Sequence, residues 1–287
     1  MREGWRQGAA HRREPGPRLN AIFNLKALSR GAPKMKFIFD GSFEGLLTAI
    51  FEVFEHRDSS AVLVSRHAYE PGLLDESVEV VANEAKSKRV WEGLTKKVDK
   101  AWQSRFYNTF LSELPQSPQH LLQFARYVFD NPRGAENNYG HPDVLALSKI
   151  DKSVNRERHR MKAFVRFQET SDGIFYAAVE PDYNVLPLIA GFFKNRYADQ
   201  RWIIYDLRRR YGLSYDLDSV TEISLDLSPE IAKGEPLSAA QRDDREELYS
   251  LLWKDYFRST NIPARKNMKL HLQHVPKRYW KYLIEKQ

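Results

Sequence analysis

The chain of 287 residues contains no cysteine. It can therefore form no disulfide, and it offers no thiolate ligand for an iron–sulfur cluster or a zinc ion. We accordingly expect no cofactor in this chain itself. A reducing, cytoplasmic location is compatible with this composition, and we expect the protein to be cytoplasmic.

Long hydrophobic runs are also missing. The longest apolar stretch, Val185 to Phe193, is interrupted by Pro187 and is about half of the ~18–20 residues that a membrane span requires. We therefore expect no membrane partner. Hydrophobic residues make up 42% of the chain and aromatic residues 13%, which argues against overall disorder.

The basic charge is unevenly distributed. The formal net charge is +7, but eight basic residues and only two acidic residues precede Met35. The rest of the chain is close to neutral. The position of the charge is therefore a better guide to a nucleic-acid partner than its sum.

Residues 1–34 have little apolar periodicity. One interpretation is an arginine-rich, acid-poor leader, and the other is a disordered or spuriously translated extension with Met35 as the natural start. We favour the second, because a strand pattern begins directly after Met35. Residues 35–287 are then predicted to form a single α+β domain with a helical subregion at 83–154.

The central stretch from Met161 to Gly212 carries the strongest local signals. Aromatic and β-branched runs at 163–167 and 175–179, separated by Ser171, Asp172 and Gly173, predict a β-hairpin. A helix is expected at 185–193, and strands at 202–205 and 220–227. The fold class is α+β: a small, mostly antiparallel sheet centred on residues 161–227, packed with the helical region 83–154 and C-terminal helices.

The start of the domain predicts a strand, a tight turn and a helix. Residues 36–40 alternate as a strand, Gly41 or Ser42 is the expected helix N-cap, and apolar residues follow at helical spacing. Such a turn can hold a phosphate, but Asp40 and Glu44 are acidic, so we favour a plain capped helix start.

Three blocks of sequence carry a resemblance to a known family. They are FDGSFEGLL from Phe39, the stretch from MKAFVRF at Met161 to WIIYD at Trp202, and NIPARKNMKLHLQHVPKRYWKYL from Asn261. Together they resemble a bacterial family described as a probable DNA metabolism protein. Its members are typically encoded beside a radical-SAM protein similar to DNA photoproduct lyases, and some are fused to a uracil-DNA-glycosylase-like domain.

The resemblance implies a role in DNA repair or modification, with the iron–sulfur cluster and SAM held only by a radical-SAM partner. The family often has a His-Phe pair where this chain has Phe192 and Phe193. No role for a histidine at that place carries over.

Basic residues in three blocks are candidate contacts to DNA phosphates, with an aromatic residue as a base-stacking platform. The alternative is solvated faces that the acidic stretch 218–247 neutralises. The candidates are Arg156, Arg158, Arg160, Arg166, Arg208, Arg209, Arg265, Lys266, Lys277, Arg278 and Trp280.

His159 and Asp206 are the candidate catalytic pair, because a His–Asp pair can act in general acid–base catalysis. The alternative is that Asp206 is the ion-pair partner of an arginine at the end of its strand. His271 and His274 share a helical face in HLQH, but no third ligand lies nearby, so we predict no metal site.

Three functions remain open at this stage. The first is a DNA-binding accessory subunit of a radical-SAM repair or modification enzyme. The second is an enzyme in its own right, a nucleic-acid lyase or glycosylase-like hydrolase. The third is a protein–protein interaction subunit without affinity for DNA.

Overall fold

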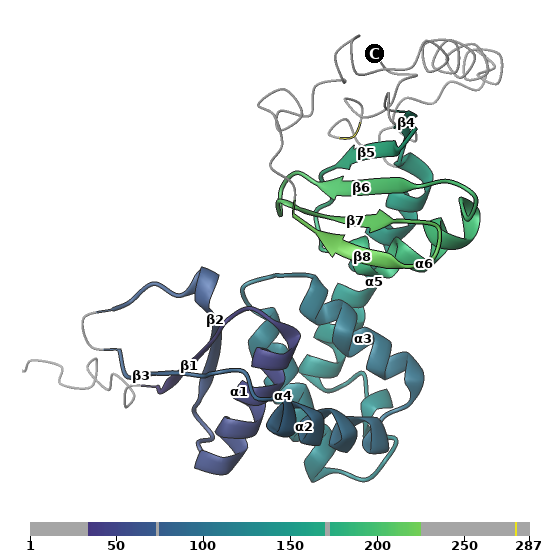
Figure 1. Cartoon of the computed structure of the whole chain (residues 1–287). Helices are drawn as coiled ribbons and strands as arrows, with labels where there is room; N and C mark the ends of the chain where they lie inside the picture. The colour runs from purple at the N-terminus through teal and green to yellow at the C-terminus, as the bar shows by residue number, and fades with distance from the viewer. Residues whose placement is uncertain (1–33, 73–74, 170–172, 225–278, 280–287) are drawn as a thin grey trace, which may run out of the picture.

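The computed structural model describes residues 34–72, 75–169, 173–224 and Tyr279. Its buried hydrophobic side chains form two clusters, one drawn from residues 37–147 and one from residues 150–215 together with Tyr279. We call the two parts the N-terminal lobe and the C-terminal lobe. Figure 1 shows the lobes one above the other, joined by a long helix.

The N-terminal lobe is built on a three-stranded parallel sheet. Strand β1 (Lys36–Phe39) lies in the middle, between β2 (Val62–Ser65) and β3 (Ser77–Glu79). Helix α1 (Phe43–His56) connects β1 to β2 and buries one face against the sheet. Its N-cap is Ser42, as predicted, because the Ser42 hydroxyl accepts a hydrogen bond from the Gly45 amide.

Further helices complete the N-terminal lobe. They are α2 (Glu84–Lys97), α3 (Lys100–Leu111) and α4 (Ser117–Asp130), with 3-10 turns η2 (Arg66–Ala68) and η3 (Ala135–Asn137) in the connections. Asn83 and Asp99 cap α2 and α3 through their side chains. The predicted helical subregion at 83–154 is confirmed, but the parallel sheet was not foreseen.

Helix α5 (Pro142–Phe164) belongs to both lobes. Its 23 residues give a rod of roughly 34 Å. Val144 and Leu147 pack in the N-terminal core, and Val154 and Met161 pack in the C-terminal core. A single continuous helix therefore ties the two cores together.

The C-terminal lobe holds a five-stranded sheet in the order β4-β5-β6-β7-β8. Strands β5 and β6 are parallel and the other neighbours are antiparallel, with helix α6 (Leu186–Arg196) crossing from β5 to β6. The strands are β4 (Gln168–Glu169), β5 (Phe175–Val179), β6 (Trp202–Asp206), β7 (Tyr211–Tyr215) and β8 (Val220–Ile223).

The predicted hairpin needs one correction. Its second strand is β5, but its first strand is the two-residue β4, and residues 161–164 are the last turn of α5. Met161 and Val165 are buried four residues apart, so they extend the helical face of Val154 into the core. Packing of the helix outweighs the local strand signal here.

The fold class predicted from the sequence is confirmed as mixed α and β, with a mostly antiparallel C-terminal sheet. The N-terminal extension and the C-terminal helices lie outside the described residues. Whether residues 35–287 form one domain stays a prediction. No helix in the described part is long and apolar enough to cross a membrane.

Candidate functional site

One face of α5 carries a row of exposed basic side chains. Lys149, Lys152, Arg156 and His159 follow one another at spacings of three and four residues, so they share one side of the helix. We call this row the α5 stripe. Within the described part of the chain, none of its members forms an ion pair or a hydrogen bond through its side chain. The stripe contains two of the predicted site residues.

The other predicted residues around α5 are less exposed. Arg158 is half-buried, and Arg160 lies 3.4 Å from the fully buried carboxylate of Glu157. Arg166, just beyond the helix, donates hydrogen bonds to the carbonyls of Ala163 and Val165 at the helix end. Arg160 and Arg166 thus stabilise α5 and its C-terminus.

Asp206 ends β6 and organises the turn that follows. Its carboxylate accepts hydrogen bonds from the amides of Arg208 and Arg209, and it also accepts one from the Arg209 guanidinium at 2.8 Å. The side chain of Asp206 is fully buried. The sequence alternative of a strand-end ion pair with an arginine is therefore what the structure contains.

Arg209 joins the two lobes. Its guanidinium also bonds Glu113 in the loop between α3 and α4, at 2.7 Å and 2.8 Å, and the carbonyls of Pro181 and Asp182. Burial disfavours its charge, but Glu113 and Asp206 outweigh burial and raise the pKa of Arg209. Burial raises the pKa of Asp206. The hydrogen bond and the charge of Arg209 lower that pKa, but they offset the effect of burial only in part.

The predicted catalytic pair is not in contact in the described structure. His159 is exposed on α5, whereas the hydrogen bonds of the Asp206 side chain within the described residues are to Arg208 and Arg209 in the turn. A catalytic role for His159 and Asp206 stays a prediction without a hydrogen bond to support it.

Two of the three basic blocks meet at one loop. Glu157 on α5 accepts a hydrogen bond from the Asp182 amide at 2.8 Å, and the Asp182 carbonyl accepts hydrogen bonds from Arg208 and Arg209. The third block, with Arg265, Lys266, Lys277, Arg278 and Trp280, lies outside the described residues.

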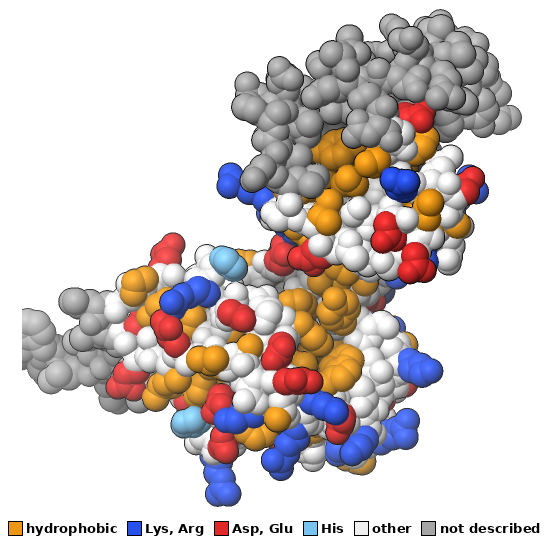
Figure 2. Space-filling model, in the orientation of Figure 1, with side chains coloured by type: hydrophobic (Ala, Val, Ile, Leu, Met, Phe, Trp, Pro, Cys, Tyr) orange, Lys and Arg blue, Asp and Glu red, His pale blue; other side chains and the backbone are white. Residues whose placement is uncertain are grey.

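A cleft of about 970 Å³ lies between the lobes. In the space-filling view the surface is notched there, and hydrophobic side chains gather where the lobes meet (Figure 2). Its N-terminal wall is the carboxyl end of β1 and β2, including Ser42, Ser65 and His67. Ligands of parallel sheets bind at this end of the strands, where the strand order reverses. The order β2-β1-β3 reverses between β1 and β3, and the end of β1 belongs to this wall.

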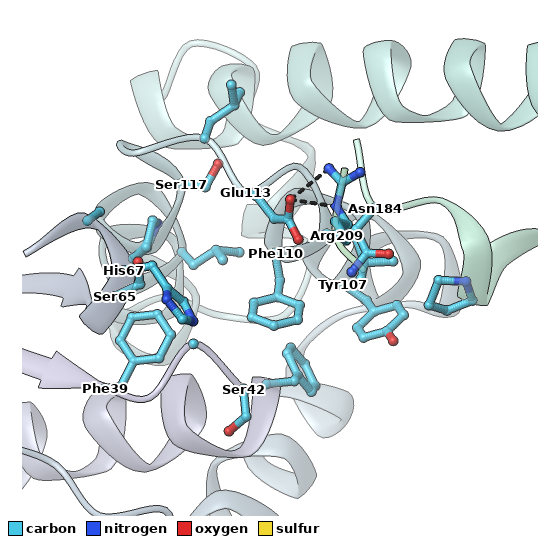
Figure 3. Close-up of a pocket in the computed structure, with 18 of the residues that line it drawn as sticks. Phe39, Ser42, Ser65, His67, Tyr107, Phe110, Glu113, Ser117, Asn184 and Arg209 are labelled. Carbon is cyan, nitrogen blue, oxygen red and sulfur yellow. Dashed lines mark hydrogen bonds and ion pairs between the residues drawn. The ribbon is translucent and has the colours of Figure 1, made fainter. Parts of the chain in front are cut away.

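Aromatic side chains form the middle of the cleft. Figure 3 shows Phe110 between His67 on one side and Tyr107 and Arg209 on the other. The opposite wall comes from the C-terminal lobe, with Arg208, Tyr211 and Glu222 among its residues. The Tyr211 hydroxyl donates a hydrogen bond to the side chain of Asn184. The backbone amide of Asn184 donates a hydrogen bond to the carbonyl of Leu111 in the other lobe, at 3.0 Å.

The sequence did not point to this cleft. Its walls come from segments far apart in the chain, and none of them has a catalytic motif. The one local signal was the strand, turn and capped helix at 36–56, since such turns stand at the carboxyl end of a strand. Among the described residues, no group of three or more His, Asp and Glu could hold a metal ion.

Comparison with known proteins identifies the family. No curated protein matches the sequence. A family model described as a domain of unknown function (DUF4130) matches residues 115–285, from the loop before α4 through the C-terminal lobe and beyond it. Because the match spans more than half of the 287 residues, the chain belongs to this family, DUF4130.

Proposed function

We propose that this protein binds DNA through the α5 stripe and acts as an accessory subunit in DNA repair or DNA modification. The observation that carries the proposal is the run of exposed basic side chains on one face of α5, without an acidic partner in the described residues. Elsewhere on the described surface, lysine and arginine often face a carboxylate, as in the pairs Lys36–Asp75 and Lys86–Glu52.

The spacing of the stripe suits a phosphate backbone. Lys149 and His159 are ten residues apart, which is roughly 15 Å along a helix. Duplex DNA carries about one charge per 1.7 Å of its axis, so several phosphates fall within that length. Cations without a protein partner hold counterions in solution, and their release on binding favours association with DNA.

Arg208 extends the same argument to the C-terminal lobe. It is exposed, and within the described part of the chain its guanidinium donates one hydrogen bond, to the Asp182 carbonyl at 3.2 Å. That carbonyl belongs to the loop that Glu157 of α5 holds in place. Arg208 and the basic part of α5 are therefore close enough to contact one nucleic acid.

The partner in this proposal is a radical-SAM enzyme. Radical-SAM chemistry needs a cluster held by cysteine thiolates, and this chain has no cysteine. The cluster and SAM then reside in the partner, as the resemblance to the DNA metabolism family implies. The role of this chain is to bring the DNA to that enzyme.

The test of DNA binding compares two triple variants with the same change in net charge. One is Lys149→Glu, Lys152→Glu and Arg156→Glu on α5, and the other is Lys88→Glu, Lys96→Glu and Lys100→Glu on exposed positions of α2 and α3. Fluorescence anisotropy with single- and double-stranded DNA at low salt gives the affinities. We expect the α5 variant to bind at least about tenfold more weakly than the control variant.

An equal loss of DNA affinity in both variants would mean that only net charge matters. The absence of DNA binding by the native chain would overturn the proposal. The partner is tested separately by co-purification with a co-expressed radical-SAM protein after nuclease treatment. A complex that forms without any affinity for DNA would favour the interaction-subunit alternative instead.

A further inference from the structure

The cleft between the lobes is a candidate ligand site whose chemistry differs from that of the α5 stripe. Three half-buried rings line it next to one another: Phe43, Tyr107 and Phe110. The ring centroid of Phe43 lies 5.1 Å from the ring centroid of Tyr107 and 5.1 Å from that of Phe110. Tyr107 and Phe110 are close to parallel, at 27° and 6.2 Å. Such a group presents π-faces on which a planar ring can stack.

Two groups of the cleft that could bind a phosphate already have partners. The N-terminus of α1 would attract an anion, but Asp40 accepts hydrogen bonds from the Ser42 amide and hydroxyl, and Ser42 itself accepts from the Gly45 amide. Arg209, the buried cation of the cleft, is already matched by Glu113 and Asp206. These contacts satisfy the N-terminus of α1 and Arg209. The other arginine of the lining, Arg208, is exposed on the opposite wall and donates a hydrogen bond to the Asp182 carbonyl.

An exposed carboxylate lies on the other wall. Glu222 on β8 is exposed, lines the cleft, and forms no ion pair or hydrogen bond through its side chain within the described residues. Burial raises the pKa of Tyr107, and the charge of Glu222 raises it further. The same carboxylate contributes to the raised pKa of Tyr211, after burial and Asp206. Glu222, Tyr107 and Tyr211 all line the cleft, so the carboxylate and the phenol rings share one site.

Aromatic faces beside an unpaired carboxylate favour a cation, because the ring quadrupole attracts positive charge and a carboxylate adds to it. The rings of Tyr107 and Phe110 are close to parallel, which favours a planar ligand over a compact ammonium group. We propose that the cleft binds a planar, positively charged ring of the class of N-alkylated purine nucleosides. In a DNA strand such a base would have to leave the stack to enter a cleft, as in base flipping.

This inference goes beyond the proposed function, since nucleoside binding in the cleft does not require the α5 stripe. The full-length chain is titrated by calorimetry with three nucleosides. 1-Methyladenosine carries a positive charge at neutral pH, adenosine is neutral, and N6-methyladenosine has the added methyl group without the charge. We expect 1-methyladenosine to bind about fivefold to tenfold more tightly than either of the other two.

Two variants assign the preference to the cleft. Glu222→Gln is expected to reduce the preference for 1-methyladenosine over adenosine, because only the attraction of the rings remains. Glu92→Gln, which changes a similarly exposed glutamate on α2, should keep the full preference. Tyr107→Ala should weaken the binding of all three nucleosides, because stacking needs the ring. Tyr107→Phe should not weaken it, because the hydroxyl has no hydrogen bond in the described structure.

Four results would overturn the inference. They are equal affinity for 1-methyladenosine and N6-methyladenosine, a preference that Glu222→Gln leaves unchanged, tighter binding of adenosine monophosphate than of adenosine, and binding of choline as tight as that of 1-methyladenosine. The α5 charge-reversal variant separates the two proposals. It should lose its affinity for DNA and keep its affinity for 1-methyladenosine. Either proposal can therefore fail without the other.

Discussion

The two lobes handle charge in different ways. In the N-terminal lobe the ion pairs lie at the surface, as in Lys86–Glu52, where 35% and 21% of the two side chains are exposed. The C-terminal lobe buries the carboxylates of Glu157 and Asp206 almost completely and pairs them with arginines. Exposed pairs contribute little to stability, whereas removing one partner of a buried pair leaves an uncompensated charge.

The difference shows where the chain depends on particular polar contacts. Hydrophobic packing around β1 and α1 accounts for the N-terminal lobe, and its buried polar side chains, such as Thr48, Asn108 and Thr109, are mostly neutral. The C-terminal lobe and the junction depend on Arg209, Asp206 and Glu157. Changes at these residues should therefore be more damaging than changes to ion pairs of the N-terminal lobe.

The largest effect is expected at Arg209. Arg209→Ala leaves Asp206 buried without its cation and removes the contact with Glu113, so the free energy of unfolding should fall by about 3–5 kcal/mol. Arg209→Lys should restore little of this, because one ammonium cannot reach two carboxylates and two carbonyls. The matched change in the other lobe, Lys86→Ala, should cost about 1 kcal/mol or less.

Urea unfolding of the three variants decides between these expectations. A similar loss for Arg209→Ala and Lys86→Ala would remove the contrast between the lobes.

The next effect tests whether α5 couples the two cores. Lys149→Pro introduces a proline between Leu147 and Ile150, where the helix passes from one core to the other, and should cost about 3 kcal/mol or more. Lys149→Ala is the control, since this side chain is exposed and should contribute almost nothing to the fold. Fluorine NMR of 5-fluorotryptophan in urea follows Trp102 in one core and Trp202 in the other.

In the proline variant, the unfolding midpoints reported by Trp102 and Trp202 should both shift to lower urea concentrations. A shift confined to Trp202 would show that the lobes fold independently of the continuous helix.

A smaller effect is expected at Tyr279, whose hydroxyl donates a hydrogen bond to the buried carboxylate of Glu157. Tyr279→Phe removes a bond to a charged group and should cost about 1.5–3 kcal/mol. Tyr107→Phe is the matched change in the N-terminal lobe, and it should be neutral because that hydroxyl has no hydrogen bond in the described structure. Thermal unfolding compares the two, and equal midpoints would contradict a dependence of the C-terminal lobe on its polar contacts.

Local signals made part of this fold predictable. The strand at 36–40, the Ser42 cap and the helix after it depend on neighbouring residues alone, and each is present. The strand that delivers Asp206 was also found, because its apolar run ends in a charged residue. Asp206 was correctly considered as the ion-pair partner of an arginine.

Long-range packing decided the rest. Residues 163–167 have aromatic and β-branched side chains that favour a strand, but Met161 and Val165 continue the buried face of α5, so the helix persists to Phe164. Strand β3 has three exposed residues, and only its pairing with β1 makes it a strand. The cleft depends on Tyr107, Arg209 and Glu222, which are distant in sequence, and no local pattern predicts that they line one cleft.

The salt dependence of DNA affinity tests the central claim, that the α5 stripe contacts phosphates, most directly. Each phosphate contact contributes about 0.9 to the slope of log affinity against log salt for duplex DNA, so removal of Lys149, Lys152 and Arg156 should reduce the slope by about 2–3. The control variant at Lys88, Lys96 and Lys100 should keep the native slope. Equal slopes for the native protein and the α5 variant would contradict the claim, whatever their absolute affinities.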